Sequence, residues 1–260
     1  MNLSCCIWAL SGPEVEAVTQ VAEAGFEQVD LRPLAFQDRA SQDWLAASGM
    51  RVCCVAATHG TPAGVSLDSA DGKTAAAAIT HAEASVAHAA QLGAGTVYTV
   101  PGGDSGPATM IRYGRVLADM AARAQVLGLK FCVEHFPGLA LPTVAATLEF
   151  LRQVDHPNLY LLFDLGHAQI SGEDPVAAIE SAGSRLGYVH LDDNDGRGDL
   201  HLSLLDGVLT QTSLRQTFKA LGDIGYGGAV SLELNAELPD PLGALRRSRE
   251  CVLRLAEEGE

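Results

Sequence analysis

Short runs of apolar, β-branched and aromatic residues alternate along this chain with longer segments rich in alanine and leucine. The short runs have the length and composition of buried β-strands, and the longer segments are typical of helices. The predicted strands are Leu3–Ile7, Gln28–Leu31, Arg51–Ala56, Thr96–Val100, Lys130–Glu134, Leu159–Asp164, Leu186–Leu191 and Ala229–Glu233. The pattern therefore predicts eight successive strand–helix units.

Glycines mark the ends of the predicted helices. A glycine that can adopt the left-handed conformation follows six of them, at Gly25, Gly49, Gly93, Gly128, Gly183 and Gly225. Eight units in 260 residues suit a closed (β/α)8 TIM barrel, an α/β fold that needs about 250 residues. A doubly wound sheet would carry a glycine fingerprint after the first strand, where Ser11-Gly12-Pro13 is only a helix start. Because no linker divides the chain, residues 1–260 are predicted to form a single domain.

The charge of the chain limits its partners. A hydrophobic content of 47% excludes a disordered protein. The chain has 17 basic and 32 acidic residues, a formal net charge of −15. Nucleic acids and anionic membranes are normally bound through Lys and Arg, so this balance argues against both as partners.

The cysteines and the N-terminal residues indicate a reduced, cytoplasmic protein. No CxxC spacing occurs among the six cysteines, which are expected to be free core thiols. They are Cys5, Cys6, Cys53, Cys54, Cys132 and Cys251. The first ten residues lack the basic region and cleavage site of a signal peptide, and no apolar run reaches 18 residues.

Four successive strands in the second half each end on a side chain that can bind a metal. These residues are Glu134, Asp164, His190 and Glu233. The C-terminal ends of barrel strands meet at one rim, where active sites are built. Taken singly, a strand-end acid is commonly a helix cap, and a lone histidine is commonly a core residue. Three converging carboxylates repel one another unless a cation joins them. The mixed ligand set suits manganese, magnesium, cobalt or zinc.

The motifs around these residues identify a resemblance. VEH, FDLGH, VHLDDNDG with DLH, and SLEL lie between residues 130 and 235. They resemble the xylose isomerase-like barrel superfamily of sugar and sugar-phosphate isomerases and epimerases, which also includes endonuclease IV. By this resemblance the four strand-end residues form the single-metal set of the ketose 3-epimerases.

The resemblance also implies a mechanism. Glu134 and Glu233 would be catalytic, and would move a proton through a metal-stabilised cis-enediolate of a sugar, sugar phosphate or keto-polyol. Proton return to the same carbon gives epimerisation, and return to the neighbouring carbon gives isomerisation. His167, in the family's DxxH motif, would contact substrate oxygens, and Arg197 would neutralise developing charge. Arg197 lies one residue further from His190 than in the ketose epimerases.

A second metal is one alternative for the loop after the seventh strand. Asp199 and His201 fill the family's DxH motif, and in endonuclease IV the matching residues bind a further zinc together with the histidine that matches His167. Binding of substrate hydroxyls and stabilisation of the loop by hydrogen bonds stay open for the same residues.

Specificity is expected to come from the first half of the chain. Trp8 could stack on a sugar ring, although a packed core tryptophan is an equal alternative. His59, after the third strand, is the second candidate for substrate binding. Asp30 and Arg32, at the end of the second strand, are further candidates. Lysine is scarce, which favours an unphosphorylated substrate.

Three other functions stay open. A metal-dependent dehydratase or lyase acting on a keto-polyol or hydroxy-keto acid shares the proton abstraction. An endonuclease IV-like phosphodiesterase is disfavoured by Val100, which stands where a histidine ligand is needed, and by the acidic charge. A barrel that binds a sugar without turnover would not need two glutamates. Homo-oligomers are common in this superfamily, so self-association is a further expectation.

Overall fold

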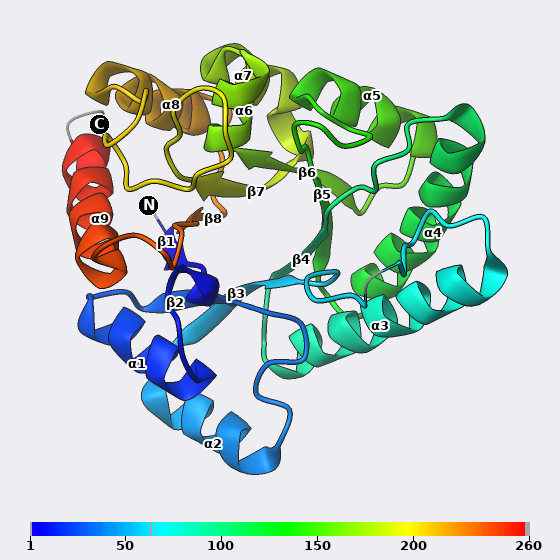
Figure 1. The fold of residues 1–260 in the computed structure, drawn as a ribbon, viewed down its shortest axis with the longest axis horizontal. Helices are drawn as coiled ribbons and strands as arrows, with labels where there is room; N and C mark the ends of the chain where they lie inside the picture. Colours follow the sequence, from blue (N-terminus) through cyan, green and yellow to red (C-terminus); the bar gives the residue numbers. More distant parts are fainter. Residues whose placement is uncertain (1, 63, 258–260) are drawn as a thin grey trace.

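The computed structural model describes residues 2–62 and 64–257, which form eight parallel strands surrounded by helices. The strands are β1 (Asn2–Cys5), β2 (Gln28–Leu31), β3 (Arg51–Ala56), β4 (Thr96–Thr99), β5 (Lys130–Glu134), β6 (Leu159–Asp164), β7 (Leu186–Leu191) and β8 (Ala229–Leu232). Their order is β1-β8-β7-β6-β5-β4-β3-β2, and a single bridge between Cys6 and Asp30 joins the two edges. The predicted TIM barrel is therefore confirmed, as a nearly closed barrel (Figure 1).

Helices follow the strands and form the outer ring of the barrel (Figure 1). They are α1 (Glu14–Glu23), α2 (Arg39–Ser48), α3 (Gly72–Gln91), α4 (Pro107–Val126), α5 (Val144–Val154), α6 (Leu165–Ser171), α7 (Pro175–Ala182), α8 (Gln211–Asp223) and α9 (Pro241–Glu257), with the 3-10 turns η1 (Ile7–Ala9) and η2 (Gly183–Arg185). The six glycines predicted to end helices all have positive φ, from 47° to 91°. Within the described ranges, no helix combines the length and apolar character needed to cross a bilayer.

Three predicted strands are longer than the observed ones. β1 ends at Cys5 because Ile7–Ala9 turns into η1, and β4 ends at Thr99 because the Val100 N–H donates to the side chain of Thr58. β8 ends at Leu232, but the Glu233 N–H still donates to the carbonyl oxygen of Leu191 at 3.1 Å. The sheet therefore still holds the backbone of Glu233 at the rim.

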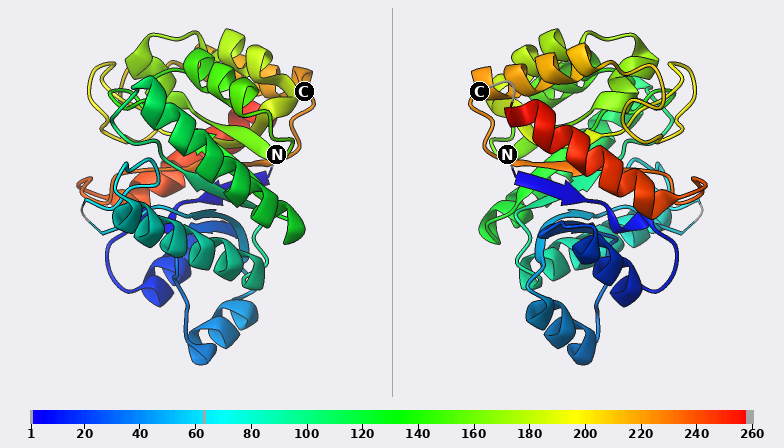
Figure 2. Two further views of the ribbon diagram at one scale, coloured as in Figure 1. Left: turned by 90° about the vertical axis from the view of Figure 1, so that its right-hand side faces the viewer. Right: turned by 90° about the vertical axis from the view of Figure 1, so that its left-hand side faces the viewer.

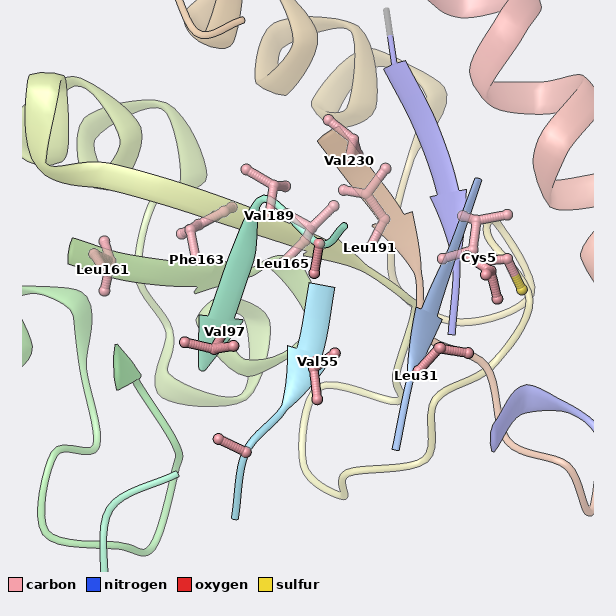
Figure 3. Close-up of a cluster of buried hydrophobic side chains, with 14 of the residues drawn as sticks. Cys5, Leu31, Val55, Val97, Leu161, Phe163, Leu165, Val189, Leu191 and Val230 are labelled. Carbon is pink, nitrogen blue, oxygen red and sulfur yellow. The ribbon is translucent and has the colours of Figure 1, made fainter. Parts of the chain in front are cut away.

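Side chains alternate between the two faces of the sheet. Outward-pointing side chains, including Val55, Phe163 and Val189, pack under the helices in the main hydrophobic core (Figure 3). A smaller apolar cluster fills the barrel interior, made of Cys54, Ala56, Tyr98, Cys132, Leu162 and Tyr188. Since alternate residues share a face, Tyr188 and His190 of β7 both point inward. Figure 2 shows the loops that follow the strands gathered on one side of the barrel.

Candidate metal centre

Four side chains from adjacent strands meet at this rim. Glu134 ends β5, Asp164 ends β6, His190 lies near the end of β7, and Glu233 directly follows β8. One ligand atom of each lies within 4.8 Å of the others. Glu134, Asp164 and His190 are buried, at 2%, 0% and 0% exposure, while the Glu233 side chain is 13% exposed. The structure thus brings together the four residues predicted to bind a metal.

His190 stands between the carboxylates. Its Nδ1 lies 2.6 Å from Glu233 Oε2, 3.6 Å from Glu134 Oε1 and 3.9 Å from Asp164 Oδ2. Burial disfavours the charged form of His190, but Glu233, Cys6 and Glu134 together outweigh burial and raise the His190 pKa well above its usual value. Three carboxylates around one imidazole form a strongly negative site.

The two glutamates of the cluster have opposite pKa shifts. Burial raises the pKa of Glu134. Burial also opposes ionisation of Glu233, but the charge of His190 lowers the Glu233 pKa to about 2. Among the protein groups alone, Glu233 is therefore the ionised carboxylate and Glu134 is the one that holds a proton more readily.

The donor atoms of the cluster fit a divalent cation. Asp164 Oδ2 and His190 Nδ1 are buried polar atoms without a hydrogen-bond partner among the described residues. Buried polar atoms are normally satisfied, so these two atoms indicate a further partner such as a cation. Three carboxylates and one imidazole are a donor set for manganese, magnesium, cobalt or zinc.

Hydrogen bonds hold the FDLGH segment, which carries Asp164 and His167, in place. Asp164 Oδ1 accepts the His167 N–H at 2.7 Å, which caps α6. Gly166 is required here because a Cβ would collide with the buried carboxylate of Asp192. That carboxylate accepts the Gly166 N–H at 3.0 Å. His135 supports the segment from β5, since its Nε2 accepts the Asp164 N–H at 3.1 Å.

A second group of possible ligands lies nearer the solvent. His167 Nε2 lies 3.5 Å from Asp199 Oδ1, and His201 Nε2 lies 3.1 Å from the same oxygen. Although burial opposes their charge, neighbouring carboxylates raise the pKa of His167 to about 10 and of His201 to about 12. His201 Nδ1 also lies 3.1 Å from Asp192 Oδ2. These three predicted residues form a cluster that could hold an ion or contact a substrate.

The predicted substrate-binding residues lie in two different places in the structure. Trp8 in η1 donates from its indole Nε1 to Glu233 Oε1 at 2.6 Å, and its ring stacks on His59 with centroids 5.7 Å apart. Burial lowers the pKa of His59. Arg197 is exposed in the rim loop, where its charge acts on Asp195. Trp8 and His59 are therefore beside the cluster, whereas Arg197 faces solvent.

The positions of two nearby residues were not predicted from the sequence. Asp30, expected to face the substrate, is fully buried inside the barrel, with Oδ2 3.8 Å from His190 Nε2. Cys6, expected to be an ordinary core thiol, has its sulfur within 4.8 Å of ligand atoms of His190 and Glu233. The alternation along QVDL was the available signal for Asp30, since it turns a charged side chain into the barrel.

The fold and the cluster at its rim define the class of this protein. Residues 18–255 match the family model of the xylose isomerase-like TIM barrel, and the chain belongs to this family.

Individual relatives are more distant. An L-ribulose 3-epimerase of Mesorhizobium japonicum is 27% identical over 252 residues, which cover 90% of this chain and 81% of that protein. An inosose dehydratase of Lacticaseibacillus casei is 27% identical over 131 residues, 45% of this chain and 44% of that protein. The chain likewise spans less than half of several other relatives. Among solved structures, the IolI protein with a bound zinc atom superposes with a TM-score of 0.82 at 17% identity, covering 100% of this chain and 99% of that one.

Proposed function

We propose that this protein is a divalent-metal-dependent sugar epimerase or isomerase that works by proton transfer beside a carbonyl. The observation that carries the proposal is the pair Glu134 and Glu233, whose carboxylates lie 3.6 and 2.6 Å from one imidazole nitrogen and have opposite pKa shifts. Relatives named L-ribulose 3-epimerase and ketose 3-epimerase support the substrate class.

Glu134, Asp164, His190 and Glu233 would hold the cation. When bound, a divalent ion supplies positive charge that polarises the substrate carbonyl and its neighbouring hydroxyl. The zinc atom in the IolI structure supports a metal in this fold, and the oxygen-rich donor set equally suits manganese, magnesium or cobalt.

The two glutamates would divide the proton transfer. Glu233, ionised and held by the Trp8 indole, would remove the proton from the carbon beside the carbonyl. Glu134, whose pKa burial raises, would hold the proton that is returned. Return to the same carbon from the opposite face inverts that centre, and return to the adjacent carbon exchanges aldose and ketose.

Trp8, His59 and His167 would bind the sugar. The stacked Trp8 and His59 rings offer an apolar surface beside Glu233, and His167 presents Nε2 toward the exposed side of the cluster near Asp199. His167, Asp199 and His201 would contact substrate hydroxyls or hold a second ion. Arg197 is exposed in the rim loop, so it would contact the substrate only if this loop closed over the site.

A dehydratase is the second candidate. Loss of water needs an acid that protonates the departing hydroxyl, and His167 and His201, which lie beside Asp199 and whose pKa values neighbouring carboxylates raise to about 10 and about 12, would supply it. The relative named inosose dehydratase supports this alternative.

Metal analysis followed by solvent isotope exchange tests the proposal. The purified protein should contain one divalent ion per chain, and should exchange one carbon-bound proton of an accepted ketose with deuterated water. Glu134→Gln and Glu233→Gln should each lower exchange by at least about 100-fold, since proton transfer by a side chain contributes about 10²–10⁴-fold.

Glu237→Gln provides a matched control, because Glu237 is an exposed glutamate four positions after Glu233. It should leave exchange unchanged. Exchange without water loss identifies the epimerase or isomerase, and water loss from an inosose identifies the dehydratase. Wild-type exchange rates in both Gln variants would show that the glutamates do not transfer the proton.

A further inference from the structure

A polar cluster lies inside the barrel, directly behind the metal centre. At its middle is Asp30 of β2, which is completely buried. Its Oδ1 accepts hydrogen bonds from the Tyr188 hydroxyl at 2.6 Å and from the Ser4 hydroxyl at 2.8 Å, and the Cys6 thiol donates to Oδ2 at 3.7 Å.

A buried carboxylate in this position needs a reason. Burial raises the pKa of Asp30, because the interior penalises its charge. The hydrogen bonds from Tyr188 and Ser4 satisfy Oδ1, whereas Oδ2 accepts from the Cys6 thiol, a weak donor. The basic group that faces Oδ2 is His190, with Nε2 at 3.8 Å.

His190 presents its two ring nitrogens to two different environments. Nδ1 faces the carboxylates of Glu134, Asp164 and Glu233, whereas Nε2 faces Asp30. Nε2 is buried and lacks a hydrogen-bond partner among the described residues. Tyr98 and Tyr188 contact the ring edge-on, at centroid distances of 5.3 and 5.7 Å, and so restrict its rotation.

The tautomer of His190 decides whether it can bind a cation. Nδ1 offers a lone pair only if the proton of the neutral ring is on Nε2. A carboxylate next to that N–H favours this tautomer and fixes the ring orientation, as is common behind histidines that bind metals. Asp30 Oδ2 is the carboxylate oxygen that faces Nε2, at 3.8 Å, so its charge acts on the N–H across a gap longer than a hydrogen bond.

We propose that Asp30 is a positioning residue for His190: it keeps the proton on Nε2, so that Nδ1 is free for the cation, and Tyr188 and Ser4 hold Asp30 in place. The inference rests on the proposed metal centre. It assigns to β2 a part in a site whose ligands come from β5, β6, β7 and the residue after β8.

The first test measures metal affinity in full-length variants by competition with a chelating dye, using Mn²⁺ and Zn²⁺. Asp30→Asn should raise the dissociation constant by about 10–100-fold, the usual effect of removing such a partner. Tyr188→Phe should raise it less, and the double variant should show less than the sum of the two effects on a logarithmic scale, because both act through Asp30. Cys132→Ala is the matched control, since it likewise changes a buried side chain of the barrel interior.

The second test needs no metal. Nitrogen-15 NMR of the imidazoles in the metal-free protein, followed to a pH at which the His190 ring is neutral, should show its remaining proton on Nε2 in the wild type and in Cys132→Ala, and a larger share of that proton on Nδ1 in Asp30→Asn. A destabilised but correctly placed site would not change this signal. Tyr188→Phe supplies the evidence if Asp30→Asn does not fold.

The outcomes separate this inference from the proposed function. Unchanged metal affinity and an unchanged His190 spectrum in Asp30→Asn would overturn the role of Asp30 while leaving the metal centre intact. If the wild type binds neither cation, the proposed metal dependence fails, and the NMR comparison still decides whether Asp30 sets the tautomer.

Discussion

Replacing Trp8 with phenylalanine should slow the proposed reaction, because the carboxylate of Glu233 would no longer be held in position. The substitution keeps an aromatic ring but removes the Nε1–H that donates to Glu233 Oε1 at 2.6 Å. Because the Glu233 side chain is only 13% exposed, water replaces the lost donor poorly. A hydrogen bond to a charged group contributes about 1.5–3 kcal/mol, and about 1.4 kcal/mol is a tenfold change in rate. We therefore expect kcat/KM to fall by about 10–100-fold.

The pH dependence gives the direction of the effect. Burial opposes ionisation of Glu233, but His190 and the Trp8 hydrogen bond keep its pKa at about 2. Removing the donor should raise this pKa, because the ionised form loses a stabilising contact. Activity that requires ionised Glu233 should thus be lost at a higher pH in Trp8→Phe than in the wild type as the solution is acidified.

Isotope exchange into an accepted ketose, followed from about pH 2 to about pH 9 so that the profile covers the Glu233 pKa of about 2, measures both quantities. Trp44→Phe is the control, since Trp44 is the other tryptophan and stacks on Phe36 away from the centre. Similar kcat/KM values and pH profiles in the wild type and Trp8→Phe, with both proteins folded, would refute the assignment of Trp8 as the residue that holds Glu233.

Three further predictions concern the cation, Cys6 and a helix cap. A divalent cation at 100 times its dissociation constant should stabilise the fold by about 2.7 kcal/mol. Calorimetry should show that the cation raises the Tm of the wild type, that a chelator reverses the rise, and that Asp164→Asn shows no such rise. Cys6→Ser keeps a hydrogen-bond donor but removes a soft sulfur atom near His190. Competition titration should therefore show a larger loss of affinity for Zn²⁺ than for Mg²⁺. Equal losses for the two ions would contradict a role of the sulfur in binding. Asp71 caps α3, and its hydrogen bonds with Thr74 lower its pKa. Its stabilisation is present above the unfolded pKa and is lost as the pH falls through the folded value, so the difference in Tm between the wild type and Asp71→Ala should vanish in acid.

The barrel and its rim residues could be predicted from the sequence because their signals are local. Five of the eight predicted strands, β2, β3, β5, β6 and β7, have the observed bounds. Each strand of the second half has a polar side chain at its end or one position from it, and parallel strands in a barrel bring such ends together. The positions of Glu134, Asp164, His190 and Glu233 thus followed from strand order and alternation.

The contacts that support the site could not be predicted, because they join distant parts of the chain. Tyr188 and Asp30 are 158 residues apart, and Trp8 and Glu233 are 225 residues apart. No local pattern marks either pair. Both depend on how the barrel closes, which brings β1 beside β8 and places the interior of β2 behind β7.

This closure has a consequence for the four ligands. Glu134 and Asp164 belong to neighbouring strands, and the Asp164 backbone is held by His135 of the same half. Glu233 and His190, by contrast, contact Trp8 and Asp30, which reach them from the first two strand units. The chain folds its last strands against its first ones through the β1–β8 pairing and the Cys6–Asp30 bridge. A substitution that loosens this seam should therefore misplace His190 and Glu233 while leaving Glu134 and Asp164 in position. Metal affinity would then report whether the barrel is closed, because two of the four proposed ligands depend on that closure.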